Sequence, residues 1–226
     1  MPQSAPPILR LENASLSFGG KCIFQNISLD LPENQFSCLL GKTGIGKSSL
    51  LRCLADILPE QARFQGKIKT QKQGFAWMAQ DDLLLPWAKT IKNIVIGAKL
   101  RKEQPDYKRA KELLMRLGLS DKQDALPHEL SGGERQRVAL ARTLYEARPI
   151  VLMDEPFSRL DALTRRELQL ITRKLLREKT VLLVTHDPQE ALFMGGDIYI
   201  MKSMGIKKIA TRSVTKTEDI LQELEG

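Results

Sequence analysis

The sequence predicts an α/β fold in which a mainly parallel sheet is preceded by antiparallel strands and interrupted by an inserted helical subdomain. A compact apolar run at 36–40 leads through a glycine-rich loop into helical apolar spacing at 47–58. Further along, the apolar runs 150–153 and 181–184 have the length of buried strands and enclose a helical pattern at 163–178. Such alternation of strands and helices is typical of a parallel sheet covered by helices.

The N-terminal segment indicates antiparallel strands. Apolar and polar residues alternate over 9–18 and 22–31, and the paired glycines Gly19 and Gly20 mark a turn between the two runs. We therefore expect a hairpin before the first strand of the parallel sheet.

The middle of the chain is predicted to be helical. Pro, Gly and Asp residues separate segments with apolar residues three and four apart, which we expect to form helices over 91–102, 107–119 and 133–147. The tail from Ile198 is expected to add short strands and a final helix over 216–225.

We expect a single domain over 1–226. Its α/β core would comprise residues 8–80 and 149–226, and its helical subdomain residues 81–148.

Composition excludes several classes of protein. A chain of 226 residues with 42% hydrophobic and 27% charged residues can bury a full globular core. No apolar run approaches the roughly 20 residues of a membrane span, and the start MPQSAPPILR lacks the charged and apolar regions of a secretory signal. Three cysteines without a CxxC pair and two histidines argue against a disulfide or zinc framework. We expect a cytoplasmic protein.

The formal net charge of +8 leaves the partner open. A basic protein can bind nucleic acid, an anionic membrane or a polyanionic small ligand. In the segment 164–179, however, cations alternate with acids at helical spacing, which favours a solvated helix face. No aromatic residues are interleaved for base stacking, so we expect no nucleic-acid partner.

The segment GKTGIGKS fits the phosphate-binding pattern G-x-x-x-x-G-K-[ST] at every fixed position. Its glycines let successive backbone N–H groups point at phosphate oxygens, Lys47 can reach the β- and γ-phosphates, and the Ser48 hydroxyl can bind Mg²⁺. The alternative is a chance glycine–lysine turn, which the strand before it and the helix after it disfavour. The residues expected to hold the triphosphate of ATP are Gly41, Lys42, Thr43, Gly44, Ile45, Gly46, Lys47, Ser48 and Ser49.

Two carboxylates end the apolar strand 150–153, at the edge where parallel sheets bind ligands. We expect Asp154 to bind Mg²⁺ and Glu155 to activate the water that attacks the γ-phosphate. An Asp-Glu pair after a strand is weak evidence alone, but beside a phosphate loop it predicts a hydrolytic site.

Three further residues are candidates for this site. His186 follows another apolar strand, so it either contacts the γ-phosphate and water or is a hydrogen-bonded structural residue. The amide of Gln80 could contact Mg²⁺ and water, and Phe18 could either stack on adenine or pack in the core.

The segment LSGGERQR, residues 130–137, resembles the signature motif of the ATP-binding subunits of ABC transporters, and the resemblance covers nearly the whole chain. In that family two subunits pack head to tail, and each ATP lies between the phosphate loop of one and the signature of the other. The resemblance implies a homodimer in which Ser131, Gly132 and Gly133 bind the γ-phosphate held by the partner.

Other family elements follow in order. By this resemblance Phe18 matches the adenine-stacking aromatic, Gln80 the Q-loop, and His186 the switch histidine. Residues 158–161 match the D-loop, whose Asp161 is implied to contact nucleotide. The assigned catalytic residues are Glu155, His186, Gln80 and Lys47, and the Mg²⁺ ligands are Ser48, Gln80 and Asp154.

Three positions depart from the commonest family pattern. Glu134 replaces a frequent glutamine, Arg159 stands where a small or amidic residue is usual, and FMGGD at 193–197 replaces a Leu-Ala-Asp-Arg type run. None removes a catalytic group, so an active ATPase is still expected.

The stretch 79–94 is similar to the Q-loop region of importer ATPases for nitrate, sulfonates and taurine, and for thiamine-precursor pyrimidines. In such importers this region receives a helix of the permease. Leu83–Trp87 is therefore expected to be an exposed apolar contact for an integral membrane permease, unless it folds onto its own core. A separate solute-binding protein and a position on the inner face of the cell membrane are implied as well.

The sequence also argues against two other classes of protein. A non-transport ABC ATPase acting on DNA or ribosomes would carry a long coiled coil or two cassettes, whereas Lys47 and Ser131 are 84 residues apart without sustained heptads. A P-loop kinase or GTPase leaves LSGGERQR unexplained and lacks a guanine-reading Asn/Thr-Lys-x-Asp motif.

Overall fold

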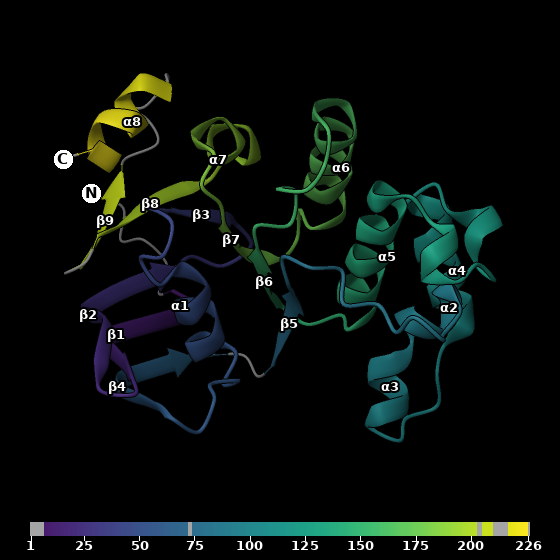
Figure 1. The fold of residues 1–226 in the computed structure, drawn as a ribbon, viewed down its shortest axis with the longest axis horizontal. Helices are drawn as coiled ribbons and strands as arrows, with labels where there is room; N and C mark the ends of the chain where they lie inside the picture. Colours follow the sequence, from purple (N-terminus) through teal and green to yellow (C-terminus); the bar gives the residue numbers. More distant parts are fainter. Residues whose placement is uncertain (1–6, 72–73, 203–204, 210–216, 226) are drawn as a thin grey trace.

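A six-stranded sheet forms the centre of the computed structural model, which describes residues 7–71, 74–202, 205–209 and 217–225 (Figure 1). All neighbouring strands of this sheet are parallel except the last pair. In spatial order the strands are β5 (Phe75–Met78), β6 (Ile150–Asp154), β7 (Thr180–Val184), β3 (Phe36–Leu40), β8 (Asp197–Lys202) and β9 (Gly205–Ile209). Every residue of β6 and β7 is buried, which explains why these strands are continuous apolar runs.

A second, antiparallel sheet has the order β2 (Lys21–Leu31), β1 (Leu9–Phe18) and β4 (Ala62–Thr70). Its buried side chains share one apolar cluster with α1 (Lys47–Leu54) and with Leu39, Leu152 and Leu182 of the main sheet. The expected hairpin is therefore confirmed. The sequence did not predict β4, because its mostly exposed residues give no apolar pattern.

The helices divide between two regions of the molecule. In Figure 1, α2 to α5 lie together beyond the β5 edge of the sheet, at the end of the molecule opposite α8. After α1, the helices are α2 (Thr90–Ile94), α3 (Ile96–Leu100), α4 (Tyr107–Arg116), α5 (Gly132–Tyr145), α6 (Ala162–Leu175), α7 (Pro188–Met194) and α8 (Thr217–Glu225), with 3₁₀ turns at Ser120–Lys122 and Pro127–Glu129. The predicted α/β class with an inserted helical region is confirmed.

The expectation of one helix over 91–102 is wrong in detail. Two short helices, α2 and α3, meet at Val95, whose backbone leaves helical geometry (φ −89°, ψ 6°). Consecutive β-branched residues at 94–96 weaken helix propensity there. Helix α7 was not predicted, although Asp187 followed by Pro188 is a regular helix start: its carboxylate accepts from the Gln189 N–H at 2.8 Å.

Asn93 fixes the chain that precedes α2. Its side chain is fully buried, and its oxygen accepts from the Leu85 N–H at 2.7 Å. Its amide nitrogen donates to the carbonyls of Leu85 and Ala88 at 3.2 and 2.7 Å. One side chain thus satisfies three backbone groups of an irregular segment.

In the parts of the chain that the structure describes, no helix combines the length and apolar character that crossing a membrane requires. Residues 1–6, which belong to the stretch examined for a secretory signal, lie outside the described residues. The same holds for part of the predicted tail at 203–204 and 210–216.

We expect Asn93→Ala to destabilise the protein by about 2–4 kcal/mol, because buried backbone groups lose their partners. For a chain of this size this corresponds to a fall of about 5–15 °C in Tm, measurable by circular dichroism. Lys92→Ala, which changes an exposed neighbour on α2, should leave Tm unchanged. Equal Tm values for the two variants would contradict the anchoring role of Asn93.

We expect one reactive thiol in the native protein and three after unfolding. Cys22 is exposed, whereas Cys38 and Cys53 are buried. Burial raises the pKa of Cys53 to about 12 and also raises the pKa of Cys38, so little reactive thiolate forms at neutral pH. Titration with a chromogenic disulfide in buffer and in denaturant checks this count, and more than one fast-reacting thiol in the native protein would contradict it.

Candidate functional site

The ends of four parallel strands bring the predicted site residues to one edge of the main sheet. Strand β3 leads into the phosphate loop, β6 ends in Asp154 and Glu155, β5 precedes Gln80, and β7 precedes His186. Because these strands run parallel and are hydrogen-bonded in register, their carboxyl ends share an edge.

The phosphate loop between β3 and α1 is a tight backbone turn. Gly44 and Gly46 have φ values of +80° and +107°, and a Cβ at Gly46 would lie 2.9 Å from Ile23 Cγ2. The Lys47 ammonium donates to the carbonyls of Gly41 and Lys42 at 2.8 and 3.1 Å, and burial lowers its pKa. The loop thus wraps around a cation, as a triphosphate site requires.

Ser48 and Asp154 form an oxygen pair beside this loop. The Ser48 hydroxyl donates to Asp154 Oδ1 at 2.9 Å, and burial raises the pKa of that carboxyl. A hydroxyl and a carboxylate are suitable ligands for Mg²⁺. Among the described residues, no three His, Cys, Asp or Glu side chains gather into a metal-binding group. This pair is therefore the candidate position for Mg²⁺.

Glu155 follows the end of β6 and contacts residues at or after the ends of β5 and β7. Its backbone is in the left-handed region (φ +44°), and its N–H donates to the Val184 carbonyl at 3.0 Å. Its Oε2 accepts from the Gln80 amide at 3.3 Å and lies 3.0 Å from His186 Nδ1. A carboxylate held in this way can accept a proton from water, with an amide and an imidazole beside it.

The loop after Glu155 is folded back on that residue. The Ser158 hydroxyl donates to the Glu155 carbonyl at 3.0 Å. At the end of the loop, Asp161 caps α6 by accepting from the backbone N–H groups of Leu163 and Thr164. Hydrogen bonding by the Thr164 side chain, and next by the Thr164 backbone, lowers the pKa of Asp161. In this chain Asp161 is thus a helix cap, whatever else it contacts.

Ser131 caps the helix that begins with the two glycines. Its hydroxyl accepts from the Glu134 N–H at 3.2 Å, and the Glu134 carboxylate accepts from the Ser131 N–H at 2.7 Å. The departure at Glu134 is therefore accommodated by a reciprocal capping box. A Cβ at Gly133 would lie 2.7 Å from Thr164 Cγ2, so α5 packs closely against α6.

The signature residues do not join the phosphate site of their own chain. In Figure 1, α5 and α1 are separated along the long axis of the molecule, with β5 and β6 between them. The glycine loop and the signature motif thus lie apart in one chain, and Ser131 and Gly132 at the start of α5 are exposed.

Phe18 lies at the end of β1, opposite Lys21 in the hairpin. It is 46% exposed, so the alternative of a core aromatic is not what the structure shows. The same hairpin packs on the phosphate loop through Ile23, which lies against Gly46. An exposed ring on this hairpin is able to stack on a base.

The segment after Gln80 is only partly an exposed apolar patch. Leu83 and Trp87 are 61% and 76% exposed, but Leu84 is buried in the core, so the expectation of an exposed Leu83–Trp87 needs this correction. Helix α5 holds the backbone of this segment: Arg142 donates to the carbonyls of Asp82 and Leu83 at 2.6 and 2.8 Å.

Sequence reasoning missed the charged contacts of this segment. Arg135 of α5 pairs with Asp82 at 3.0 Å, and Arg159 pairs with Asp81. The departure of Arg159 from the family pattern was the only sequence signal.

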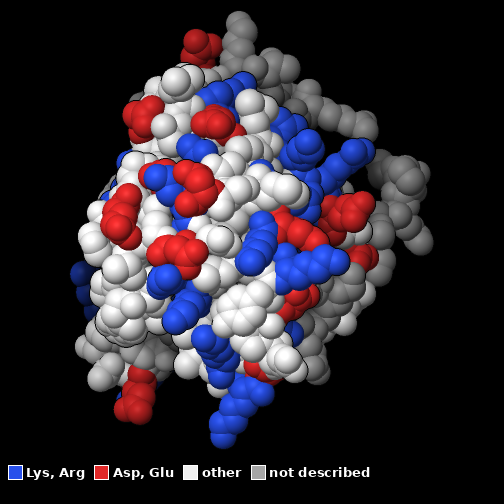
Figure 2. Space-filling model, turned by 90° about the vertical axis from the view of Figure 1, so that its right-hand side faces the viewer, with Lys and Arg blue, Asp and Glu red and all other residues white. Residues whose placement is uncertain are grey.

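Figure 2, which views the side of the molecule carrying α2 to α5, shows cationic and anionic side chains interspersed, as expected for a solvated face.

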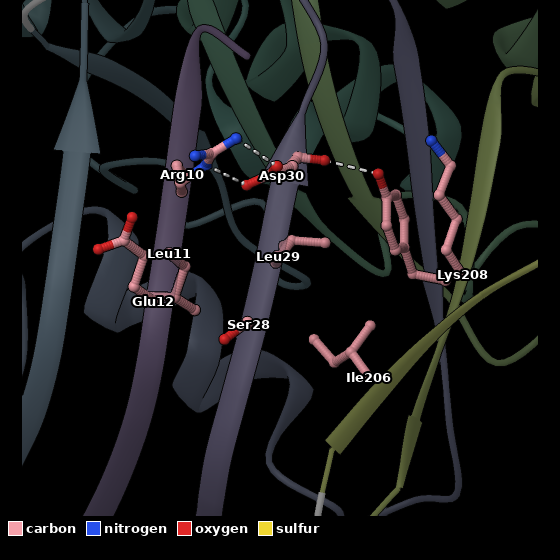
Figure 3. A pocket seen from close by; sticks show the side chains of 9 residues that line it. Arg10, Leu11, Glu12, Ser28, Leu29, Asp30, Ile206 and Lys208 are labelled. Atoms are coloured by element: carbon pink, nitrogen blue, oxygen red, sulfur yellow. Dashed lines mark hydrogen bonds and ion pairs between the residues drawn. The ribbon is translucent and has the colours of Figure 1, made fainter. Parts of the chain in front are cut away.

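A separate groove of about 520 Å³ lies between β1, β2 and the β8–β9 pair (Figure 3). Its charged side chains are paired: Arg10 with Asp30, Glu12 with Lys69, and Lys208 with Asp197. The Tyr199 hydroxyl donates to the Asp30 carbonyl at 2.6 Å across the groove. The charged side chains that line this groove thus all have ion-pair partners within the protein.

Comparison with known proteins agrees with this site. Residues 24–158 match the family model described as ABC transporter. An uncharacterized ABC transporter ATP-binding protein of Haemophilus influenzae is 42% identical over 214 residues, covering 93% of this chain and 89% of the relative. An aliphatic sulfonates import ATP-binding protein of Mesorhizobium japonicum, SsuB 2, is 39% identical over 216 residues, covering 94% and 85%.

Solved structures give the same result. A putative metal-chelate type ABC transporter in an inward-facing conformation superposes with a TM-score of 0.83 at 26% identity, over 98% of this chain and 89% of that one. A dimeric ATP-binding cassette in a post-hydrolysis state with ADP and phosphate gives a TM-score of 0.78 at 26% identity, over 91% and 100%. On both grounds, this chain belongs to the ABC transporter family and is one of its ATP-binding, ATP-hydrolysing subunits.

Proposed function

We propose that this ATPase energises the import of a small solute, and that the solute is an aliphatic sulfonate or a similar small anion. The similarity to relatives named as aliphatic sulfonates import proteins supports this substrate class. The observation that carries the enzymatic part is the convergence of the phosphate loop, Asp154 and Glu155 at one sheet edge.

In this proposal ATP binds across the glycine loop. The backbone of residues 41–46 and the start of α1 receive the phosphates, and the Lys47 ammonium exchanges its carbonyl partners for phosphate oxygens. Ser48 and Asp154, with Gln80 nearby, would hold Mg²⁺, which neutralises phosphate charge when bound. Phe18 would stack on the adenine.

Glu155 is proposed to take the proton of the attacking water. Gln80 and His186 contact its Oε2 and thereby orient the carboxylate. No covalent intermediate on the protein is needed, because phosphoryl transfer to water depends mainly on positioning and charge stabilisation.

The second copy of the chain is proposed to complete each site. Since α5 and α1 are separated along the long axis of the molecule in Figure 1, we propose that Ser131, Gly132 and Gly133 at the start of α5 contact the nucleotide held by a second copy. The dimeric state of the similar solved cassette supports this arrangement. A head-to-tail pair contains two such sites related by two-fold symmetry.

A permease is proposed to bind the helical subdomain, residues 81–148, through Leu83 and Trp87. These exposed apolar side chains lie on a segment whose backbone is hydrogen-bonded to Arg142 of α5. A partner bound to this segment would therefore be in indirect contact with the helix that begins with the signature motif. In this proposal the chain works at the cytoplasmic face of the membrane, with a separate solute-binding protein supplying the cargo.

We expect Glu155→Gln to lower the ATPase rate at least about 100-fold, since a general base contributes on that order. The variant should still bind ATP and should accumulate as an ATP-bound dimer, detected by light scattering after size-exclusion chromatography. Glu178→Gln, an exposed position in the turn after α6, is the control and should keep the parental rate. Parental turnover by Glu155→Gln would show that the base has been wrongly assigned.

We expect a Leu83→Ala/Trp87→Ala variant to lose its membrane partner while its ATPase rate stays close to parental. The measurement is affinity purification from native membranes, in which the parent should retain an integral membrane permease. Leu221→Ala on α8, an exposed leucine at the opposite end of the molecule, is the matched control and should retain it. Equal recovery with both variants would exclude docking through Leu83 and Trp87.

A further inference from the structure

Two adjacent aspartates after Gln80 pair with cations from different parts of the chain. Asp81 forms an ion pair with Arg159, which lies in the loop between β6 and α6. Asp82 forms an ion pair with Arg135 of α5 at 3.0 Å. The first pair joins the loop after β5 to the loop after β6, two segments more than 70 residues apart in sequence.

The Arg159–Asp81 pair closes a ring of contacts around Glu155. On one side, the Gln80 amide donates to Glu155 Oε2, and Asp81 is the next residue. On the other side, the Ser158 hydroxyl and backbone N–H donate to the Glu155 carbonyl at 3.0 and 3.2 Å, and Arg159 is the next residue. Arg159 and Asp81 therefore join the two loops that flank the proposed base.

We propose that Arg159 is a positioning residue for ATP hydrolysis, which acts through Asp81 to keep Gln80 in hydrogen-bond reach of Glu155. This inference rests on the proposed roles of Gln80 and Glu155. The departure from the usual small or amidic residue gives this chain an ion pair between its two loops, which an uncharged residue cannot form.

The geometry makes Gln80 sensitive to such a link. Its hydrogen bond to Glu155 is 3.3 Å long, so a small shift of the loop would break it. Asp81 and Arg159 are 53% and 68% exposed, so the pair is weak and is screened by salt. A contact of this kind changes the population of a loop conformation rather than the stability of the fold.

The test compares steady-state ATPase kinetics of Arg159→Ala, Asp81→Asn and the charge exchange Arg159→Asp/Asp81→Arg. We expect each single variant to lower kcat about two- to fivefold, the range that a weak ion pair can supply, with KM for MgATP unchanged. The charge exchange should restore most of the rate. Arg10→Ala, which removes an exposed ion pair far from this edge, is the matched control and should keep parental kinetics.

Two further measurements separate positioning from a general structural effect. Raising salt from about 0.05 M to 0.5 M should lower the parental kcat more than that of Arg159→Ala, because only the parent has this pair to screen. In a Gln80→Ala background, Arg159→Ala should cause no further loss, since both changes remove the same interaction.

Several results would overturn the inference: an unchanged or increased kcat in Arg159→Ala, a charge exchange that restores nothing, or additive losses with Gln80→Ala. The Glu155→Gln variant shows whether a negative result concerns only the positioning role of Arg159 or the proposed function itself. If Glu155→Gln is inactive and Arg159→Ala is parental, only the positioning role fails. If Glu155→Gln retains the parental rate, the assignment of the base fails first.

Discussion

The parallel register of β5, β6, β7 and β3 is the constraint on which the site depends. Four chain segments end at the same edge because their strands are hydrogen-bonded side by side and run in one direction. The complete burial of β6 and β7 resists any slip, since a shift by one residue would exchange the two packed faces of each strand. The core thus sets where the glycine loop, Glu155 and the segment that carries His186 leave the sheet.

A second level of organisation connects the helices to that edge. The segment after β5 carries Gln80 at its start and is then bound by Arg142 and by Asn93. Both side chains are largely buried and contact backbone atoms, so the path of the segment depends on them rather than on its own apolar residues. Leu83 and Trp87 are exposed on this segment, whose carbonyls at Asp82 and Leu83 accept from Arg142.

The sequence was sufficient for the fold class and for the strand ends that carry the site. Glycine spacing, buried apolar strands and the residues that follow them are local signals, and each reports a backbone requirement. Helix α7 was not predicted, although Asp187 and Pro188 are a local signal for its start. The single helix expected over 91–102 failed at a run of β-branched residues where tertiary packing determines the backbone.

The contacts that were not predicted are pairings between residues distant in sequence. Nothing in the local pattern at Asp81 or Asp82 indicates that their partners are Arg159 and Arg135, because ion pairs have no periodic signature. The threefold hydrogen bonding of Asn93 is similarly invisible, since a lone asparagine in a helix start is ordinary. These interactions depend on how the folded chain brings distant segments together.

The distance between the N-termini of α1 and α5 within one chain has a kinetic consequence. If each complete site draws its halves from two molecules, turnover of dilute chain rises with the square of its concentration until most molecules are paired. Two copies held on one membrane protein would escape this dependence, because tethering replaces bulk concentration with a high effective local one. The membrane partner would then set the activity of the enzyme by holding its two halves together, before any cargo arrives.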